Sequence, residues 1–235
     1  MKKYFTKWDN HLYTTPYKGN KKNVLVIGDL HAPFTLKTYL QFCRHQQEKF
    51  DCGTVIFIGD IVDNHYSSFH DTDPSGMGAD DEVNEAILQL NEWKKLFPSC
   101  YVTIGNHDAI IARKLFANGI SQKYLKSFNE VFNLPKEWKF VDQIIINKVL
   151  YTHGTTNALK RMTDARISVV QGHLHSLSYV QHSQSEIDGL FAVQTGCGID
   201  IKSFAFAYGK SFGKKPVISC AVILDNGKLP IVITI

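Results

Sequence analysis

Short apolar runs, each followed within two residues by glycine, recur along the chain. They cover residues 24–27, 55–58, 101–104, 149–152 and 167–170. Their length and their β-branched content predict strands, because they are too short for a helical period to appear. Runs that are this apolar are typical of parallel strands covered on both faces. The pattern therefore predicts a series of strands, each of which leads into a polar turn.

Helical spacing appears between several of these runs. Apolar residues at helical intervals predict one helix over residues 36–50 and a longer one over 80–97. We expect Asp80 or Asp81 to cap the longer helix and Pro98 to stop it. Its apolar stripe consists of Val83, Ala86, Ile87, Leu90, Trp93 and Phe97. Further helices are predicted over residues 109–116, 121–131 and 156–166.

The second half of the chain is dominated by strand patterns. Strands are predicted over residues 140–146 and 148–152, and a hairpin joins 217–224 to 229–235. The hairpin is indicated by Asp-Asn-Gly at 225–227, because Asn-Gly between apolar runs is a strong turn signal. No repeat or linker divides the sequence. We therefore expect an α/β protein with one domain spanning residues 1–235.

Two segments show no regular pattern. Residues 1–22 contain scattered aromatic side chains and predict an irregular N-terminal arm. Residues 64–80 form a long run of turn-forming residues, and loops of this length are usually functional or disordered. We expect an active-site loop there, with His65 and His70 facing substrate. The alternative, that these histidines only fold the loop on itself, is equally open.

Composition restricts the class of protein. Hydrophobic residues make up 44% of the 235 residues, as in globular proteins. The five cysteines show no C-x-x-C pairing, which favours reduced, buried thiols over disulfides or a zinc site. No stretch has the roughly 20 apolar residues of a membrane span, and the first residues do not resemble a signal peptide. We expect a soluble, cytoplasmic protein without a membrane partner, and the sequence predicts no particular oligomeric state.

The net charge of +4 suits an anionic ligand without requiring one. Lysines cluster at residues 18–22 and again at 202–215, where Tyr208 and Phe212 lie among them. Aromatic and basic residues together are compatible with base stacking beside backbone contacts. A solvated basic surface is the alternative interpretation.

Metal-type side chains follow all five apolar runs. These side chains are Asp29, His31, Asp60, Asn106, His153, His173 and His175. Each residue type is also common in ordinary turns, so any one of them alone would be a weak signal. Their repeated position after predicted strands makes coincidence a poor explanation, because ligands bind at the carboxyl ends of strands in open α/β sheets. Carboxylate, imidazole and amide ligands suit a pair of divalent ions that share one anion.

The ordered motifs are GDLH at 28–31, GDIVD at 59–63, GNHD at 105–108, HG at 153–154 and GHLH at 172–175. Together they resemble the calcineurin-like metallophosphoesterase superfamily, and the compact chain is similar to small bacterial and phage members. The resemblance implies a four-layer α/β/β/α sandwich of two mixed sheets flanked by helices. It also implies metal-dependent hydrolysis of phosphate esters.

The resemblance assigns roles to individual residues. It implies a first ion held by Asp29, His31, Asp60 and His175. It implies a second ion held by Asp60, Asn106, His153 and His173. His107 matches the proton donor to the leaving oxygen, and Asp63 matches the carboxylate that orients it. We expect Mn²⁺, with Fe, Zn or Ni as alternatives, because mixed nitrogen and oxygen sites discriminate weakly.

The substrate class is inferred from positions at which this chain differs from the protein-phosphatase relatives of the same superfamily. Protein-phosphatase relatives usually place Arg-Gly after the second motif, where Asn64 and His65 stand here, and Glu where Asp108 stands. The GHLH ending is typical of the phosphodiesterase and nuclease branch. We therefore expect a phosphodiesterase acting on a nucleotide or nucleic acid. A phosphomonoesterase, including a protein phosphatase, is the first alternative, and a non-catalytic scaffold with the same fold is the second.

Arg113 is a candidate substrate ligand. It lies six residues after His107 in a predicted helix, close enough in sequence to face the site. Its guanidinium can form a bidentate contact with phosphate oxygens. An ordinary surface arginine is the equally open alternative.

Overall fold

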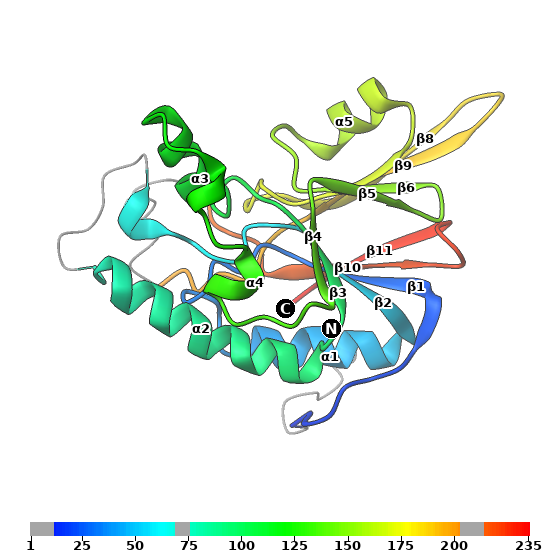
Figure 1. Cartoon of the computed structure of the whole chain (residues 1–235). Helices are drawn as coiled ribbons and strands as arrows, with labels where there is room; N and C mark the ends of the chain where they lie inside the picture. Colours follow the sequence, from blue (N-terminus) through cyan, green and yellow to red (C-terminus); the bar gives the residue numbers. More distant parts are fainter. Residues whose placement is uncertain (1–11, 69–75, 203–213) are drawn as a thin grey trace.

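Two mixed β-sheets lie face to face at the centre of the molecule (Figure 1). The computed structural model describes residues 12–68, 76–202 and 214–235. The first sheet has the order β11-β10-β1-β2-β3-β4. Its strands are β1 (Asn20–Ile27), β2 (Cys52–Phe57), β3 (Cys100–Thr103), β4 (Trp138–Val141), β10 (Ser219–Leu224) and β11 (Leu229–Thr234). The second has the order β5-β6-β7-β9-β8. Its strands are β5 (Gln143–Ile146), β6 (Val149–Thr152), β7 (Ser168–Gln171), β8 (Ser178–Gln184) and β9 (Gly189–Thr195).

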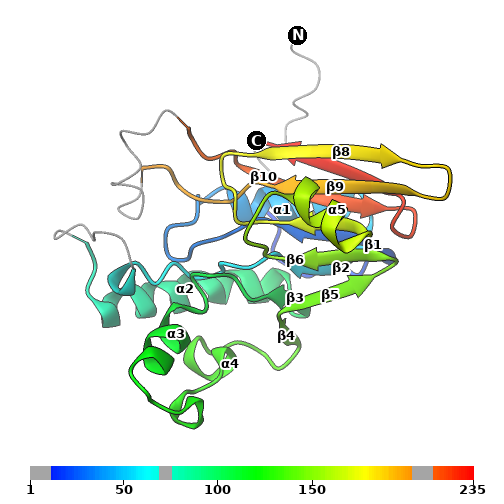
Figure 2. The same cartoon turned by 90° about the horizontal axis from the view of Figure 1, so that it is seen from above.

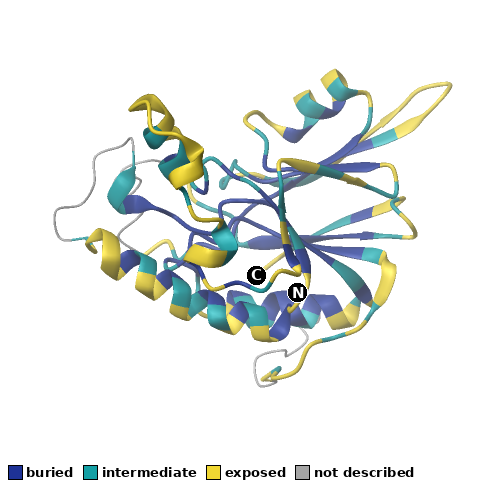
Figure 3. Cartoon of the chain, viewed as in Figure 1, coloured by how far each residue is buried: buried dark blue, intermediate teal, exposed yellow. Residues whose placement is uncertain are grey.

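Helices cover the outer faces of both sheets. The helices α1 (Tyr39–Lys49) and α2 (Ala79–Leu96) pack on the first sheet, and α5 (Ala158–Ala165) packs on the second (Figure 2). Three apolar cores result: one under α1 and α2, one between the sheets and one under α5. In Figure 3 the buried positions follow these three interfaces. The predicted four-layer sandwich of two mixed sheets flanked by helices is confirmed.

The strands that precede the motifs run parallel to one another within each sheet. In the first sheet β1 pairs with β2, and β2 pairs with β3, all in parallel. In the second sheet β6 pairs with β7 in parallel. All five predicted strands form, and their carboxyl ends meet on one side of the sandwich. Because these strands are covered on both faces, their sequences are apolar without alternation.

The predicted helix over 121–131 is wrong. The structure has a 3-10 turn η2 (Gln122–Tyr124), an extended Leu125 and a short helix α4 (Phe128–Val131). Ser127 and Glu130 form a capping box that begins this new helix, with Glu130 accepting the backbone N–H of Ser127 at 2.9 Å. The S-x-x-E pattern was readable in the sequence and marks a helix start inside the predicted span.

The predicted strand over 140–146 is also wrong. The chain bends at Asp142, so β4 belongs to the first sheet and β5 to the second. β4 pairs in parallel with β3, whereas β5 pairs in antiparallel with β6. A continuous apolar run gives no sign of such a crossing, because both parts have the same local pattern. The crossing joins the two sheets beside the motif-bearing strand ends.

The long helix α2 confirms its predicted apolar stripe and its stop before Pro98, but its start differs. Gly78 is the N-cap residue, and no side chain caps the helix. Asp80 and Asp81 instead lie in the first turn, where carboxylates interact favourably with the helix dipole. The other predicted helices form as α1, α3 (Ile110–Ala117) and α5, with ends shifted by a few residues.

Several further expectations are met at the ends and in the core of the chain. β10 and β11 form the predicted antiparallel hairpin, and residues 225–227 all have positive φ angles. All five cysteines are free and buried. Within the described ranges, no helix has the length and apolar character needed to cross a membrane. Residues 12–19 carry no helix or strand, but β1 begins at Asn20, inside the predicted arm, so the arm is shorter than predicted. Residues 1–11 and residues 69–75, including His70, lie outside the described residues.

The core under α2 predicts a clear contrast between two leucines of that helix. Leu90 is fully buried, whereas Leu88 is 59% exposed. We expect Leu90→Ala to lower the free energy of unfolding by about 2–5 kcal/mol, because it removes buried methylenes and leaves a cavity. Leu88→Ala, the same change on the same helix, should stay within about 0.5 kcal/mol of the parent protein. Urea unfolding monitored by circular dichroism measures both, and equal losses would contradict the described packing.

Candidate metal centre

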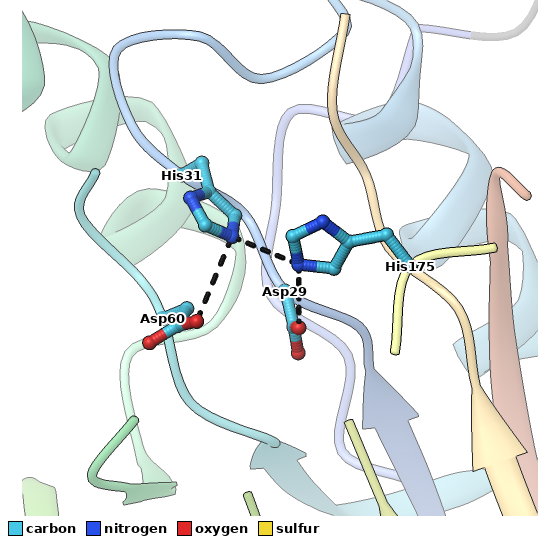
Figure 4. Close-up of side chains that lie close together, drawn as sticks. All are labelled: Asp29, His31, Asp60 and His175. Carbon is cyan, nitrogen blue, oxygen red and sulfur yellow. Dashed lines mark hydrogen bonds and ion pairs between the residues drawn. The ribbon is translucent and has the colours of Figure 1, made fainter. Parts of the chain in front are cut away.

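The strand ends bring four predicted ligands together in one cluster: Asp29, His31, Asp60 and His175 (Figure 4). His31 Nε2 lies 3.1 Å from His175 Nε2 and 3.7 Å from Asp60 Oδ2. His175 Nε2 lies 3.1 Å from Asp29 Oδ2. The four side chains come from the loops after β1, β2 and β7, so the sheet topology alone makes these distant residues neighbours.

A second cluster adjoins the first and contains Asp60, His153 and His173. Asn106 lies between the two imidazoles, with its Oδ1 at 2.9 Å from His153 Nε2 and at 2.9 Å from His173 Nδ1. His153 Nε2 also lies 3.2 Å from Asp60 Oδ2. All seven side chains that the sequence proposed as ligands therefore lie within these two adjoining clusters.

The donor atoms fit divalent cations. Asp60 Oδ2 faces His31 in one cluster and His153 in the other, so one carboxylate oxygen is shared by both. Asp29 Oδ1 is buried and accepts no hydrogen bond among the described residues. The Nε2 atoms of His31 and His175 face each other. Unless one of these two nitrogens carries a proton, both direct a lone pair into the same space, where a cation can accept them. Carboxylate oxygens and imidazole nitrogens are the donors that Mn²⁺, Fe²⁺ and Zn²⁺ accept.

Contacts behind the clusters fix the orientation of two imidazole rings. His153 Nδ1 donates to the backbone oxygen of Ile58 at 3.0 Å, which directs Nε2 into the second cluster. His31 Nδ1 lies 2.5 Å from Asp63 Oδ1, which directs its Nε2 into the first. Metal-binding histidines commonly use their second nitrogen in this way, because the contact fixes the tautomer and makes the ligand nitrogen more basic.

His107 lies at the edge of both clusters and is held by backbone atoms. Its backbone N–H donates to Asp60 Oδ1 at 2.8 Å, and its ring nitrogen Nδ1 donates to the backbone oxygen of Asp63 at 2.6 Å. Asn64 Nδ2 donates to the backbone oxygen of His107 at 2.9 Å. The Asp63 carboxylate, which the sequence assigned to His107, lies 3.5 Å from Nδ1 and contacts His31 more closely. The main chain of Asp63, more than its side chain, orients His107.

The carboxylates and imidazoles shift one another's pKa values. Burial lowers the pKa of His153, but the charges of Asp60 and Asp29 outweigh it and raise the value to about 10. Burial raises the pKa of the Asp60 carboxyl, but His153 and His31 outweigh it and hold the value below its usual range. Burial also lowers the pKa of His107, whereas Asp60 and Asp63 raise it, with a net increase. His107 is therefore biased toward the protonated form.

Two motif glycines allow the backbone to approach the buried carboxylates. A Cβ atom on Gly105 would lie 2.0 Å from Asp60 Oδ1, and one on Gly172 would lie 2.2 Å from Asp29 Oδ1. Neither carboxylate can move away, since both are buried. The glycines at these motif positions are thus a steric requirement of the clusters.

Asp108 is a functional residue that the sequence did not assign. Its Oδ2 accepts the N–H of Gly105 at 2.8 Å, and its Oδ1 accepts those of Ile61 at 3.0 Å and Val62 at 3.3 Å. One carboxylate thus fixes the loop after β3 to the loop after β2. Burial and the charge of Asp60 raise the pKa of Asp108 to about 7, and the N–H donors oppose this by favouring the charged form. Its place directly after Asn106 and His107 is the signal that could have found it.

Glu82 plays a similar role from helix α2. Its two carboxylate oxygens accept the N–H of His65 at 2.7 Å and that of Tyr66 at 3.0 Å. Burial raises the pKa of Glu82 to about 7, against the effect of these two donors. The contact fixes the start of the loop that follows Asp63. No local pattern marks Glu82, because it lies in a helix turn with other acidic residues.

The proposed substrate ligands occupy different surroundings. His65 is buried, with Nδ1 at 3.7 Å from Asp63 Oδ2 and its ring edge-on to Phe34. It therefore packs behind the clusters. Arg113 is exposed on α3 and lines a hollow together with Asn106 and His153. His70 lies outside the described residues.

Comparison with known proteins gives one family match. A sequence model described as calcineurin-like phosphoesterase matches residues 22–201. No curated protein sequence matches the chain. Similar solved structures include vacuolar protein sorting 29 from Cryptosporidium parvum, with 14% identity, 93% of this chain and 97% of that chain covered, and a TM-score of 0.44. For the phosphoesterase YfcE from E. coli the identity is 14%, the alignment covers 86% of this chain and 88% of that chain, and the TM-score is 0.42. For the nuclease MPE from Pseudomonas putida the identity is 13%, the alignment covers 90% of this chain and 87% of that chain, and the TM-score is 0.40.

The shared carboxylate predicts metal-dependent stability. Mn²⁺ at about 100 times its dissociation constant should raise the free energy of unfolding by about 2.7 kcal/mol. Asp60→Asn should lose most of this gain, because the shared oxygen loses its charge. Asp225→Asn, an exposed change in the β10–β11 turn, should keep it. Urea unfolding with and without Mn²⁺, together with metal analysis of the dialysed proteins, measures this, and an undiminished gain in Asp60→Asn would exclude the site.

The carboxylate of Asp108 predicts a second effect, on the loops themselves. Asp108→Asn replaces one acceptor oxygen by an NH₂ group, which cannot accept the backbone N–H that it faces. We expect a loss of about 1–3 kcal/mol in the free energy of unfolding, the cost of an unsatisfied buried group. Thermal unfolding of the protein in EDTA measures this without any contribution from metal. A stability equal to that of Asp225→Asn would contradict the role assigned to Asp108.

Proposed function

The chain belongs to the calcineurin-like phosphoesterase family, as its motifs predicted, and from this premise we propose that it is a phosphodiesterase with a dinuclear metal centre. Its substrate in this proposal is a nucleotide or nucleic acid. The observation that carries the proposal is the position of Asp60 between two clusters of carboxylate, imidazole and amide donors. Mn²⁺ is the proposed metal, and Fe, Zn or Ni suit the same donors.

The two clusters divide the predicted ligands into two sets. Asp29, His31, Asp60 and His175 would hold one ion, and Asp60, Asn106, His153 and His173 would hold the other. A pair of divalent ions supplies a water of lowered pKa and neutralises charge on the attacking and leaving oxygens. The chain contributes the geometry for this chemistry, since the carboxylates of both sets are buried and contacts from behind orient His31 and His153.

His107 is the proposed proton donor. Its Nδ1 donates to the backbone oxygen of Asp63, which leaves Nε2 for the substrate. The carboxylates of Asp60 and Asp63 raise its pKa, and so favour the charged imidazolium that can give a proton to an alkoxide leaving group. The side chain is 19% exposed, more than the ligands Asp29 and Asp60. A substrate oxygen can therefore approach it from the open side.

Features near His107 favour a diester over a monoester. A monoester carries close to two negative charges near neutral pH, one more than a diester. Asn64 occupies the place of the protein-phosphatase arginine, and its side chain is engaged by the backbone oxygen of His107. His65 is buried, next to Asp63 and Phe34. These two positions thus supply no fixed cation for the extra charge.

A hollow beside the second cluster can receive one substituent of a diester. It has a volume of about 590 Å³ and is lined by Asn106, His153 and Thr155 on the metal side. Two arginines and two carboxylates line the same hollow: Arg113, Arg161, Asp142 and Asp164. The bidentate contact proposed for Arg113 would be made here, to the phosphate or to a neighbouring phosphate of a polynucleotide.

The role of His107 predicts a dependence on the leaving group. We expect His107→Ala to keep its bound metal yet lose about 10²–10⁴-fold in kcat on diesters with alkyl leaving groups. Its loss on bis-p-nitrophenyl phosphate should be much smaller, because nitrophenolate leaves without a proton. His182→Ala, an exposed histidine on β8, is the matched control and should match the parent protein on both substrates. Equal losses of His107→Ala on both substrates would remove it from this role.

The diester preference predicts a ranking of two simple substrates. With Mn²⁺ at neutral pH, kcat/KM for bis-p-nitrophenyl phosphate should exceed that for p-nitrophenyl phosphate. A tenfold ranking in the opposite direction, about 1.4 kcal/mol in transition-state binding, would favour the phosphomonoesterase alternative. Bound metal without hydrolysis of either ester would favour the scaffold alternative. Steady-state assays on the metal-loaded protein measure both rates.

A further inference from the structure

Residues 110–126 form a basic segment beside the metal centre. The segment comprises α3, the turn that follows it and η2, and we refer to it as the α3 lobe. It contains Arg113, Lys114, Lys123 and Lys126 and no acidic residue, a balance of +4 that equals the net charge of the whole chain. In Figure 2 α3 and its neighbours lie to one side of both sheets. The lobe thus carries four positive charges that no acidic residue of the same segment balances.

The same lobe exposes two aromatic side chains. Phe116 is 76% exposed and Tyr124 is 84% exposed, and Figure 3 shows this part of the chain as largely exposed. Ile120, between them in sequence, is 41% exposed. Single exposed apolar residues are normal on protein surfaces. Two rings within nine positions of a segment with four cations and no carboxylate are a more specific combination.

The lobe is continuous with the metal centre through two hollows. The first, described above, connects Asn106 and His153 to Arg113. The second has a volume of about 740 Å³ and connects Arg113 to Phe116 and Gln122. Arg113 and Asp142 line both hollows, so the two hollows meet at these residues. The positive charge of Arg113 and the negative charge of Asp142 balance there. Lys123 and Lys126, two of the lobe's other cations, are exposed.

We propose that the α3 lobe binds single-stranded nucleic acid, with bases stacked on Phe116 and Tyr124 and backbone phosphates beside the lobe's cations. The strand would continue past Arg113 and bring one phosphodiester to the metal centre. This inference rests on the proposed function and names the surface that selects its substrate. Stacking on exposed rings requires unpaired bases, which favours a single strand over a duplex.

The chemistry of the lobe favours nucleic acid over a protein partner. The cores of protein–protein interfaces are depleted in lysine, whereas three of the four cations here are lysines. A groove of cations with interleaved rings is the common design of proteins that bind single strands without sequence preference. A strand bound in this way should dissociate as salt is raised, because its binding releases counterions.

Binding can be tested separately from hydrolysis. The full chain is titrated in EDTA against a fluorescein-labelled oligothymidylate of about 20 nucleotides, long enough for the usual site sizes, and anisotropy is measured at several salt concentrations. Hydrolysis of bis-p-nitrophenyl phosphate by the unaltered protein with Mn²⁺ is measured in parallel. Hydrolysis without strand binding would overturn this inference and leave the proposed function intact. Strand binding without hydrolysis of the small ester would overturn the proposed function and leave the binding surface intact.

Two double variants test the surface itself. Phe116→Ala with Tyr124→Ala should weaken binding at least roughly tenfold, because two stacking contacts are lost. Lys123→Ala with Lys126→Ala should reduce the slope of log K against log salt by about 1.4, at about 0.7 per phosphate contact on a single strand. All four side chains are exposed, so the changes remove little packing.

Matched controls lie on the opposite, β-hairpin parts of the chain. Ile187→Ala removes a 96% exposed apolar side chain, and Lys228→Ala removes an exposed cation of the β10–β11 turn. Both should bind the strand as the parent protein does. The inference is overturned if the lobe variants bind no more weakly than these controls. It is also overturned if the parent protein binds phosphatidylserine vesicles in the same buffer but not the strand.

Discussion

The buried carboxylate of Asp60 is the group on which the arrangement of the strand ends depends. It is 1% exposed, and a buried charge is stable only when it is paired and hydrogen-bonded. Its Oδ1 accepts the N–H of His107, and its Oδ2 faces His31 and His153. Its backbone oxygen also accepts two N–H groups of the loop after β1. Three loops, which follow β1 and β3 in the first sheet and β6 in the second, are thus positioned by contacts to Asp60.

Much of this arrangement could be predicted from the sequence, because its local signals are strong. Apolar runs ending in Gly-Asp, Gly-Asn and Gly-His indicated strand ends, and all seven proposed ligands lie in two adjoining clusters. The contacts between loops could not be predicted. Asp63 was assigned to His107, but its carboxylate lies closer to His31, since that choice depends on how the loops after β1 and β2 meet in space. The same holds for Glu82, whose partners lie 16 and 17 residues away in sequence.

Secondary structure was missed where one residue changes the path of the chain. The bend at Asp142 moves the chain from one sheet to the other, although the residues on both sides are strand formers. This crossing has a consequence for the site, because Asp142 lines both hollows that lead away from the second cluster. The capping box at Ser127 similarly ends the α3 lobe and begins α4. Both misread positions therefore border the α3 lobe or the hollows that lead to it.

The proposed chemistry and the proposed selection of substrate involve parts of the fold with different physical constraints. The clusters are built around buried carboxylates, and a Cβ atom on Gly105 or Gly172 would already collide with them. We expect changes there to affect folding together with the proposed metal binding and catalysis. The α3 lobe carries its rings and most of its cations in solvent, so changes there remove little buried area. Under the proposed function, the binding surface can change without disturbing the proposed metal ligands, because among the described residues the two sets meet at the loop that begins at Gly105 and leads into α3.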